Sequence, residues 1–149
     1  MTRIRVATTI DAPPARVWDD VRDLASHVEW MHDAVAIRFT SRRRAGVGTT
    51  FECDTKVGPL RLTDHMEVTE WRTRRAIGIR HVGVVTGEGR FTVRRRGRGR
   101  TRFTWDERLH FPIWMGGPLG GAIGGLVLRA VWTRNLRALK KRVERGLPG

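Results

Sequence analysis

The spacing of hydrophobic residues changes once along the chain, near residue 111, and this change constrains the fold more than any other feature of the sequence. From Ala34 to Phe111 apolar residues recur mostly at every second position, the period of a strand with one buried face. From Leu119 to about Arg145 they recur with a period near 3.6, which predicts one long amphipathic helix. An antiparallel sheet followed by such a helix is expected to bury one face against it. The predicted inner residues of the helix are Ile123, Leu126, Val127, Ala130, Val131, Leu136, Leu139 and Val143.

The N-terminal part of the sequence predicts one strand and two short helices. The segment RIRVATTI places Ile4, Val6 and Ile10 on one face, as a strand would. The segment DAPPARVWDDVRDL follows with prolines near its start, so we expect a helix with Asp11 as its N-cap. A second short helix is expected over residues 25–31.

Turn-forming stretches divide the region from Ala34 to Phe111 into six further strands. The breaks are SRRRAGVG, VGP, WRTRR, VVTGEG and RRGRGR, and each contains the glycine, proline or polar residues that favour turns. The strands are therefore predicted to form an antiparallel meander joined by hairpins. No linker, repeat or low-complexity spacer interrupts the sequence, so we expect a single domain over residues 1–149.

The chain is strongly basic, which bears on its partners and location. Its 29 Lys and Arg residues outnumber 15 Asp and Glu residues, for a net charge of +14. Such a field attracts nucleic acids, anionic membrane surfaces and acidic ligands. Cys53 is the only cysteine, and the first residues lack the apolar segment of a secretory signal. We therefore expect a cytoplasmic location, with peripheral attachment to a membrane as an option.

Several motifs, together with the predicted order of elements, resemble one known superfamily. The motifs are IDAPPARVWDDVRDLASHVEW, GVGTTF, TEW, FTWDERLHFP and NLRALKKRVE. They resemble the SRPBCC superfamily, the START-like helix-grip domains that include polyketide cyclase/dehydrase-like proteins. The resemblance implies an α+β fold in which a curved, seven-stranded antiparallel sheet surrounds a long C-terminal helix, with two short helices between its first and second strands. It also implies a hydrophobic cavity between sheet and helix for a lipid, polyketide or similar ligand. We expect no cofactor.

Strand alternation predicts which side chains face such a cavity, because successive residues point to opposite sides of a sheet. The residues expected to contact a hydrophobic ligand are Trp30, Phe39, Phe51, Cys53, Met66, Phe91, Phe103, Trp105, Phe111 and Trp132. A lone cysteine in a mostly apolar strand is interpreted as a small buried side chain and not as a nucleophile.

Asp64, His81 and Glu107 interrupt this apolar inner face. Burying an unpaired carboxylate is costly, so the two acids must be protonated, paired or in contact with water. We predict that the three residues orient the polar atoms of a ligand. One alternative is an enzyme, a polyketide cyclase or dehydratase in which they act as acid and base. Another is a purely structural role in hydrogen bonds or arginine pairs.

The sequence predicts neither a metal site nor a nucleotide site. The histidines and Cys53 lack the spacing of metal ligands. The sequences GVG (46–48) and GEG (87–89) precede predicted strands and do not open a helix. We interpret both as turns.

Three glycine pairs, 116–117, 120–121 and 124–125, stand at the start of the long helix. A glycine costs a helix interior about 1 kcal/mol relative to alanine. We predict that the missing side chains leave ligand volume at the mouth of the cavity and let this end of the helix swing. The alternatives are close packing of the backbone on the sheet, and membrane contact through Ile113, Trp114 and Met115.

Two arginine-rich stretches, residues 42–44 and 94–102, are predicted to lie on loops. They could attach the protein to nucleic acid, or to an anionic membrane surface from a position beside the cavity mouth. No aromatic residue interleaves with these arginines, so bases would have no stacking platform. Nucleic acid is therefore the less favoured partner.

Overall fold

The structure, a computed structural model, describes residues 1–146, so the last three residues of the expected domain lie outside it. Seven strands form one antiparallel sheet in the order β1-β7-β6-β5-β4-β3-β2. The strands are β1 (Thr2–Ile10), β2 (Ala34–Phe39), β3 (Thr50–Val57), β4 (Leu60–Arg72), β5 (Ala76–Val82), β6 (Thr86–Arg95) and β7 (Thr101–His110). The helices are α1 (Pro14–Val21), η1 (Leu24–Glu29), η2 (Ile113–Met115) and α2 (Gly117–Arg145), of which η1 and η2 are 3-10 helices. The predicted fold is confirmed, and η2 is an element that the sequence analysis did not predict.

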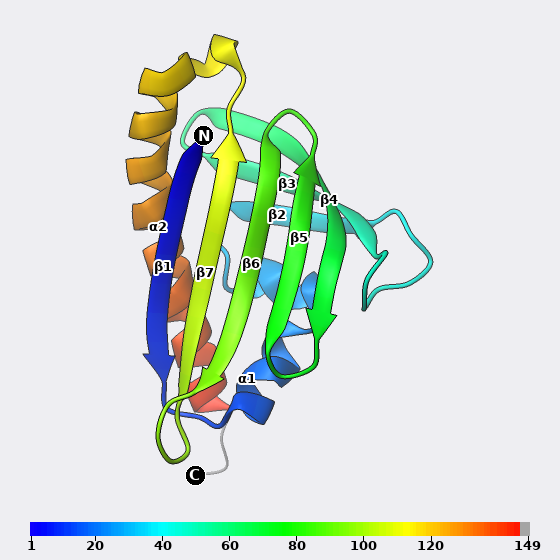
Figure 1. Ribbon diagram of the computed structural model, residues 1–149, viewed down its shortest axis with the longest axis vertical. Coiled ribbons are helices and arrows are strands. Elements are labelled where there is room, and N and C mark those ends of the chain that lie inside the picture. Colours follow the sequence, from blue (N-terminus) through cyan, green and yellow to red (C-terminus); the bar gives the residue numbers. More distant parts are fainter. Residues whose placement is uncertain (147–149) are drawn as a thin grey trace.

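The long helix α2 runs beside β1 along the sheet (Figure 1). Its first turns lie at the end of the sheet where β7 finishes, and its last turns lie near α1 at the opposite end (Figure 1). The sheet therefore has an inner face, on the side of α2, and an outer face. On the outer face, Arg3 of β1 contacts Asp106 of the neighbouring strand β7 at 2.9 Å, and Arg90 of β6 contacts Glu70 of β4 across β5 at 2.7 Å. Such exposed pairs contribute little stability, and they show that this face is in contact with water.

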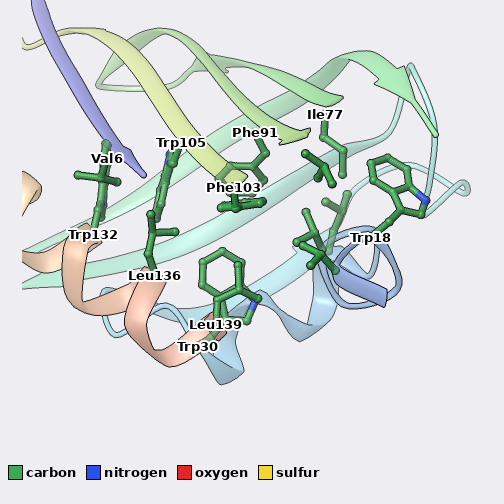
Figure 2. Packing of buried hydrophobic residues seen from close by; sticks show 14 of the residues in the cluster. Val6, Trp18, Trp30, Ile77, Phe91, Phe103, Trp105, Trp132, Leu136 and Leu139 are labelled. Atoms are coloured by element: carbon green, nitrogen blue, oxygen red, sulfur yellow. The ribbon is translucent and has the colours of Figure 1, made fainter. Parts of the chain in front are cut away.

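The packed core lies beneath the C-terminal half of α2. Trp132 stacks on Trp105 of β7, with ring centroids 4.3 Å apart and an interplanar angle of 13°. Leu136 and Leu139 follow on the same side of the helix and are completely buried. Figure 2 shows these side chains between α2 and the strands, and Trp30 of the segment after η1 belongs to the same buried cluster. This half of α2 is fixed to the sheet by large apolar side chains.

The N-terminal half of α2 faces the sheet with glycines. A Cβ atom placed on Gly121 would lie 2.7 Å from Thr2 Oγ1, and one on Gly125 would lie 2.9 Å from Thr2 Cγ2. The backbone of α2 therefore packs directly against β1. This is the close packing on the sheet that was one of the alternatives predicted for the glycine pairs. The prediction that Leu126 and Ala130 face inward is wrong, because both are exposed.

The start of α1 also differs from the prediction. The N-cap is Pro13, whose carbonyl accepts hydrogen bonds from the N–H groups of Arg16 and Val17. Asp11 lies too early in the chain to cap this helix. Its backbone N–H donates to Glu144 Oε1 at 2.8 Å, which ties the end of β1 to the last turns of α2.

We expect Leu139→Ala to lower the free energy of unfolding by about 2–5 kcal/mol, because it empties a fully buried site. The matched control is Leu126→Ala, the same deletion at an exposed position of the same helix, which should change it by about 0.5 kcal/mol or less. Urea denaturation of both variants measures the difference. Equal losses would contradict the division of α2 into a packed half and an open half.

Candidate functional site

A cavity of about 510 Å³ lies between the inner face of the sheet and the N-terminal half of α2. This volume is typical of small-molecule sites. The apolar side chains that line it come from β2 to β7, from η1 and its following segment, and from α2. The sheet residues among them include Ile37, Phe51, Leu62, Met66, Ile77, Ile79, Phe91, Trp105 and Leu109. The cavity is therefore a mainly hydrophobic chamber that continues from the packed core.

The mouth of the cavity lies where its lining residues are also exposed. These residues are Leu60 at the start of β4 and Ile123 and Val127 on α2, with exposed fractions of 40%, 56% and 43%. Gly124 also lines the cavity, and a Cβ atom placed on it would have a single neighbour within 4 Å, the ring of Phe111 at 3.9 Å. The glycine pairs thus divide their roles. Gly121 and Gly125 allow close packing on β1, and Gly124 leaves space beside the cavity.

Seven of the ten residues predicted to contact a ligand line this cavity. They are Phe51, Cys53, Met66, Phe91, Trp105, Phe111 and Trp132. The other three do not line it. Phe103 packs against Phe91 in the core, Trp30 lies behind Phe91 and Trp105, and Phe39 lies beneath the guanidinium of Arg44. The alternation of apolar and polar residues along each strand identified the residues of the inner face. It did not identify which of these residues belong to the packed core and which line the cavity.

Asp64, His81 and Glu107 all line the cavity. His81 Nε2 lies 3.1 Å from Glu107 Oε1, and both side chains are almost fully buried. Asp64 Oδ2 accepts a hydrogen bond from the hydroxyl of Thr55 at 3.0 Å. The ring nitrogen Nδ1 of His81 is buried and has no hydrogen-bond partner within residues 1–146. The structure thus gathers the three predicted polar residues on one wall of an apolar chamber.

Gly89 leaves the space that the contact between His81 and Glu107 requires. His81 belongs to β5 and Glu107 to β7, so the Glu107 side chain must cross β6, where Gly89 is its register partner. A Cβ atom on Gly89 would lie 2.8 Å from Glu107 Cγ and 2.9 Å from its Cδ. The interpretation of GEG as a turn is wrong, because β6 begins at Thr86 and includes both glycines. The sequence did contain a signal for this placement. Residues 89 and 91 are two positions apart, so in a strand residue 89 points to the same inner face as Phe91.

The surroundings of His81 and Asp64 shift their pKa values. Burial lowers the pKa of His81, but the charge and hydrogen bond of Glu107 and the charge of Asp64 outweigh it, so the net shift is upward. Burial raises the pKa of Asp64, with partial opposition from the charge of His81 and the hydrogen bond of Thr55. His81 therefore holds its proton to a higher pH than a free imidazole does, beside a carboxyl group that also holds its proton more tightly than usual.

Asp33 is a lining residue that the sequence analysis missed. Its Oδ2 accepts a hydrogen bond from Trp132 Nε1 at 3.0 Å, and its Oδ1 accepts one from Asn135 Nδ2 at 2.7 Å. Asn135 Oδ1 in turn accepts from the backbone N–H of His32 at 2.8 Å. This network joins the segment before β2 to α2. Asp33 lies just before a strand, so no alternation pattern pointed to it.

Two further titratable residues of the lining are uncharged at neutral pH. Burial lowers the pKa of His27 to about 4, and its Nε2 donates to the carbonyl of Val21 at 2.7 Å. Burial raises the pKa of the Cys53 thiol to about 12. Cys53 is therefore a thiol and not a thiolate nucleophile.

The arginine-rich hairpin does not lie beside the mouth. In the β6–β7 ladder, Arg95 pairs with Thr101 at one end and Thr86 pairs with His110 at the other, just before η2. The hairpin is thus at the far end of the sheet from the start of α2 (Figure 1). Attachment to nucleic acid or to a membrane through these arginines stays a prediction.

Ile113 and Trp114 of η2, near the mouth, have exposed fractions of 89% and 69%, whereas Met115 lines the cavity. Peripheral membrane contact through η2 also stays a prediction. Over the described chain, no helix is long and apolar enough to span a membrane. Among these same residues, no group of three His, Cys, Asp or Glu side chains is placed to hold a metal ion.

A curved antiparallel sheet that encloses an apolar cavity with a long C-terminal helix defines the START-like helix-grip class of proteins. The sequence pattern of one family, described as polyketide cyclase / dehydrase and lipid transport, matches residues 1–144, and the chain belongs to that family. In a comparison with curated proteins, no sequence matched.

Solved structures support the same fold. A START superfamily protein from Mycobacterium smegmatis is 16% identical, with a TM-score of 0.77 over 97% of this chain and 99% of its own. The Zhui aromatase/cyclase from Streptomyces sp. R1128 is 17% identical, with a TM-score of 0.78 over 96% and 93%. A protein from Thermus thermophilus is 19% identical, with a TM-score of 0.78 over 98% and 99%.

We expect the imidazole of His81 to titrate above its ordinary value of about 6.5 in the wild type and below it in Glu107→Gln, where burial remains but the partner charge is lost. Gly89→Ala should act in the same direction, because it displaces Glu107. NMR titration of the His81 ring in the wild type and in each variant measures this. An unchanged His81 titration in both variants would contradict the assigned pairing.

The same shift predicts a sign for the pH dependence of stability. Because the folded-state pKa of His81 is raised, its contribution is fully present below about pH 6.5, the unfolded value, and is lost as the pH rises through the folded value. In Glu107→Gln the contribution should change sign and favour the folded state as the pH rises. Urea denaturation across this range compares the two proteins.

Proposed function

We propose that this protein binds a hydrophobic small molecule, such as a lipid or a polyketide, in the cavity between the sheet and α2. The observation that carries the proposal is a mainly apolar chamber of about 510 Å³ with a mouth bordered by Leu60, Ile123 and Val127. An empty apolar volume of this size costs stability, so a bound ligand would stabilise the fold. The family match supports the same class of ligand.

Within the cavity, we propose that Asp64, His81 and Glu107 orient the polar group of the ligand. The rest of the wall offers few hydrogen-bonding side chains, so these groups would fix the direction in which a ligand enters. His81 Nδ1, buried and unpartnered within residues 1–146, supports this role, because a buried polar atom normally has a partner.

Gly124→Leu tests the proposal by filling the cavity from the helix. We expect this variant to bind a hydrophobic fluorescent probe, N-phenyl-1-naphthylamine, at least about tenfold more weakly, since overpacking costs about 1–3 kcal/mol. Its stability should be unchanged or higher by up to about 1 kcal/mol, because leucine is a better helix former than glycine. The matched control is Ala122→Leu, at an exposed position on the same turn that does not line the cavity.

Equal probe binding by Gly124→Leu and Ala122→Leu would overturn the proposed site. Native mass spectrometry of the gently purified wild type provides an independent readout. A hydrophobic molecule that copurifies with the wild type and is absent from Gly124→Leu would identify the class of ligand.

An enzyme of the cyclase or dehydratase type is the second candidate function. It is favoured by one observation, the placement of an acid with a raised pKa, Asp64, near the His81–Glu107 pair in an apolar chamber. Such an arrangement can remove a proton beside a carbonyl and return one to a leaving hydroxyl. The likeness to an aromatase/cyclase structure is consistent with it.

If chemistry takes place, Asp64→Asn and Glu107→Gln should each lower the turnover of a cyclising polyketide by about 100-fold or more, the usual contribution of acid–base catalysis. Binding of the apolar probe should persist in both variants. The measurement is single-turnover product formation with each protein. Unchanged turnover in both variants would exclude these residues as acid and base.

A further inference from the structure

The cavity is acidic although the protein as a whole is strongly basic. The carboxyl groups among its lining residues are those of Asp33, Asp64 and Glu107. Among the described lining residues, His81 is the one basic side chain that contacts an acid inside the chamber. Arg90 also borders the cavity, but its guanidinium donates to both oxygens of Glu70, at 2.7 and 3.1 Å, on the outer face of the sheet. The inside of the cavity thus carries the opposite sign of charge from the +14 of the chain.

The charges inside the cavity are only partly balanced. His81 neutralises Glu107 at 3.1 Å. Asp33 is held by the indole N–H of Trp132 and the amide of Asn135, which are uncharged donors. Asp64 receives a hydrogen bond from Thr55. In the part of the chain that the structure describes, neither Asp33 nor Asp64 forms an ion pair with a lysine or arginine.

A second observation places an unmet hydrogen bond on the same wall. His81 is 7% exposed, and its Nδ1 lacks a partner in residues 1–146. When Nε2 faces Glu107 and the ring is charged, Nδ1 carries a proton to donate. Most of the surrounding wall is apolar, and low polarity strengthens the interaction of any ligand group with these few charges.

We propose that the cavity selects hydrophobic ligands whose polar end is a hydrogen-bond donor without negative charge, an ammonium or a hydroxyl group, and rejects fatty carboxylates. This inference rests on the proposed ligand-binding function. An ammonium or hydroxyl group donates to Asp64, and a hydroxyl oxygen also accepts from His81 Nδ1–H. A carboxylate could also accept from His81 Nδ1–H, but the charge of His81 already faces Glu107, so a carboxylate would add a negative charge beside Asp33 and Asp64 with no unpaired lysine or arginine among the described lining residues.

Three ligands with the same chain and different polar ends test this selectivity: dodecylamine, dodecanol and dodecanoate. Each competes with N-phenyl-1-naphthylamine for the wild-type protein at neutral pH, below its micelle concentration. The basic surface attracts dodecanoate from outside, so the series is repeated at about 1 M salt, where the Debye length falls to about 3 Å. Displacement of the dye that persists at high salt reflects binding of the ligand in the cavity and not on the surface.

We expect the amine and the alcohol to displace the dye at concentrations at least about tenfold lower than dodecanoate, since one like charge nearby is worth more than a tenfold step in affinity. Asp64→Asn should reduce this ratio. The matched control is Asp19→Asn, which removes the same charge from an exposed position on α1 and should leave the ratio unchanged.

Displacement by dodecanoate at the same concentration as the amine would overturn the selectivity and leave the ligand-binding function standing. Failure of all three ligands, and of the dye itself, to bind would instead remove the ligand-binding function. An unchanged ratio in Asp64→Asn would overturn the role given to that carboxyl group. If Asp64→Asn does not fold, the wild-type series alone still decides the selectivity.

Discussion

The packing of the C-terminal half of α2 against the sheet determines where everything else in the molecule can lie. The stacked rings of Trp105 and Trp132, followed by Leu136 and Leu139, hold this half of the helix at side-chain distance from the strands. Further toward its N-terminus, the helix is held at β1 through its glycine backbone. Beside this contact the helix contributes glycines and the mouth residues Ile123 and Val127, which leave the inner face of the sheet uncovered, so core and cavity share one continuous surface of the sheet.

This arrangement also concentrates the electrostatics of the protein in two separate places. Outside, arginines on strands and hairpins are in contact with water, where each charge is screened and each ion pair is weak. Inside, few charged groups lie in an apolar chamber, where every charge acts strongly on its neighbours. The net charge of the chain therefore determines which molecules are attracted to the surface. The carboxyl groups of the chamber determine which ligands can stay bound inside.

The sequence alone predicted the strands, the long helix and the inward parity of Asp64, His81 and Glu107, because a strict period of two leaves few choices of face. It did not predict that His81 meets Glu107 across β6, since that contact depends on the register of three strands. It also predicted that Leu126 faces inward, although this residue is exposed. Where glycines form the inward side of a helix, the apolar stripe no longer marks the buried side. The option of an arginine-rich hairpin beside the mouth is wrong, because consecutive connections of an antiparallel meander lie at opposite ends of the sheet, which separates the β6–β7 turn from the start of α2.

The crossing of the Glu107 side chain over Gly89 carries a consequence for how this family of sequences can diverge. A glutamate at position 107 and any side chain larger than hydrogen at position 89 compete for the same volume. The two sites are therefore expected to evolve as a pair, with the acid surviving only in lineages that retain the glycine. In relatives with a short residue at position 107, a larger side chain at position 89 would become sterically possible. That correlated change would mark the loss of the buried acid.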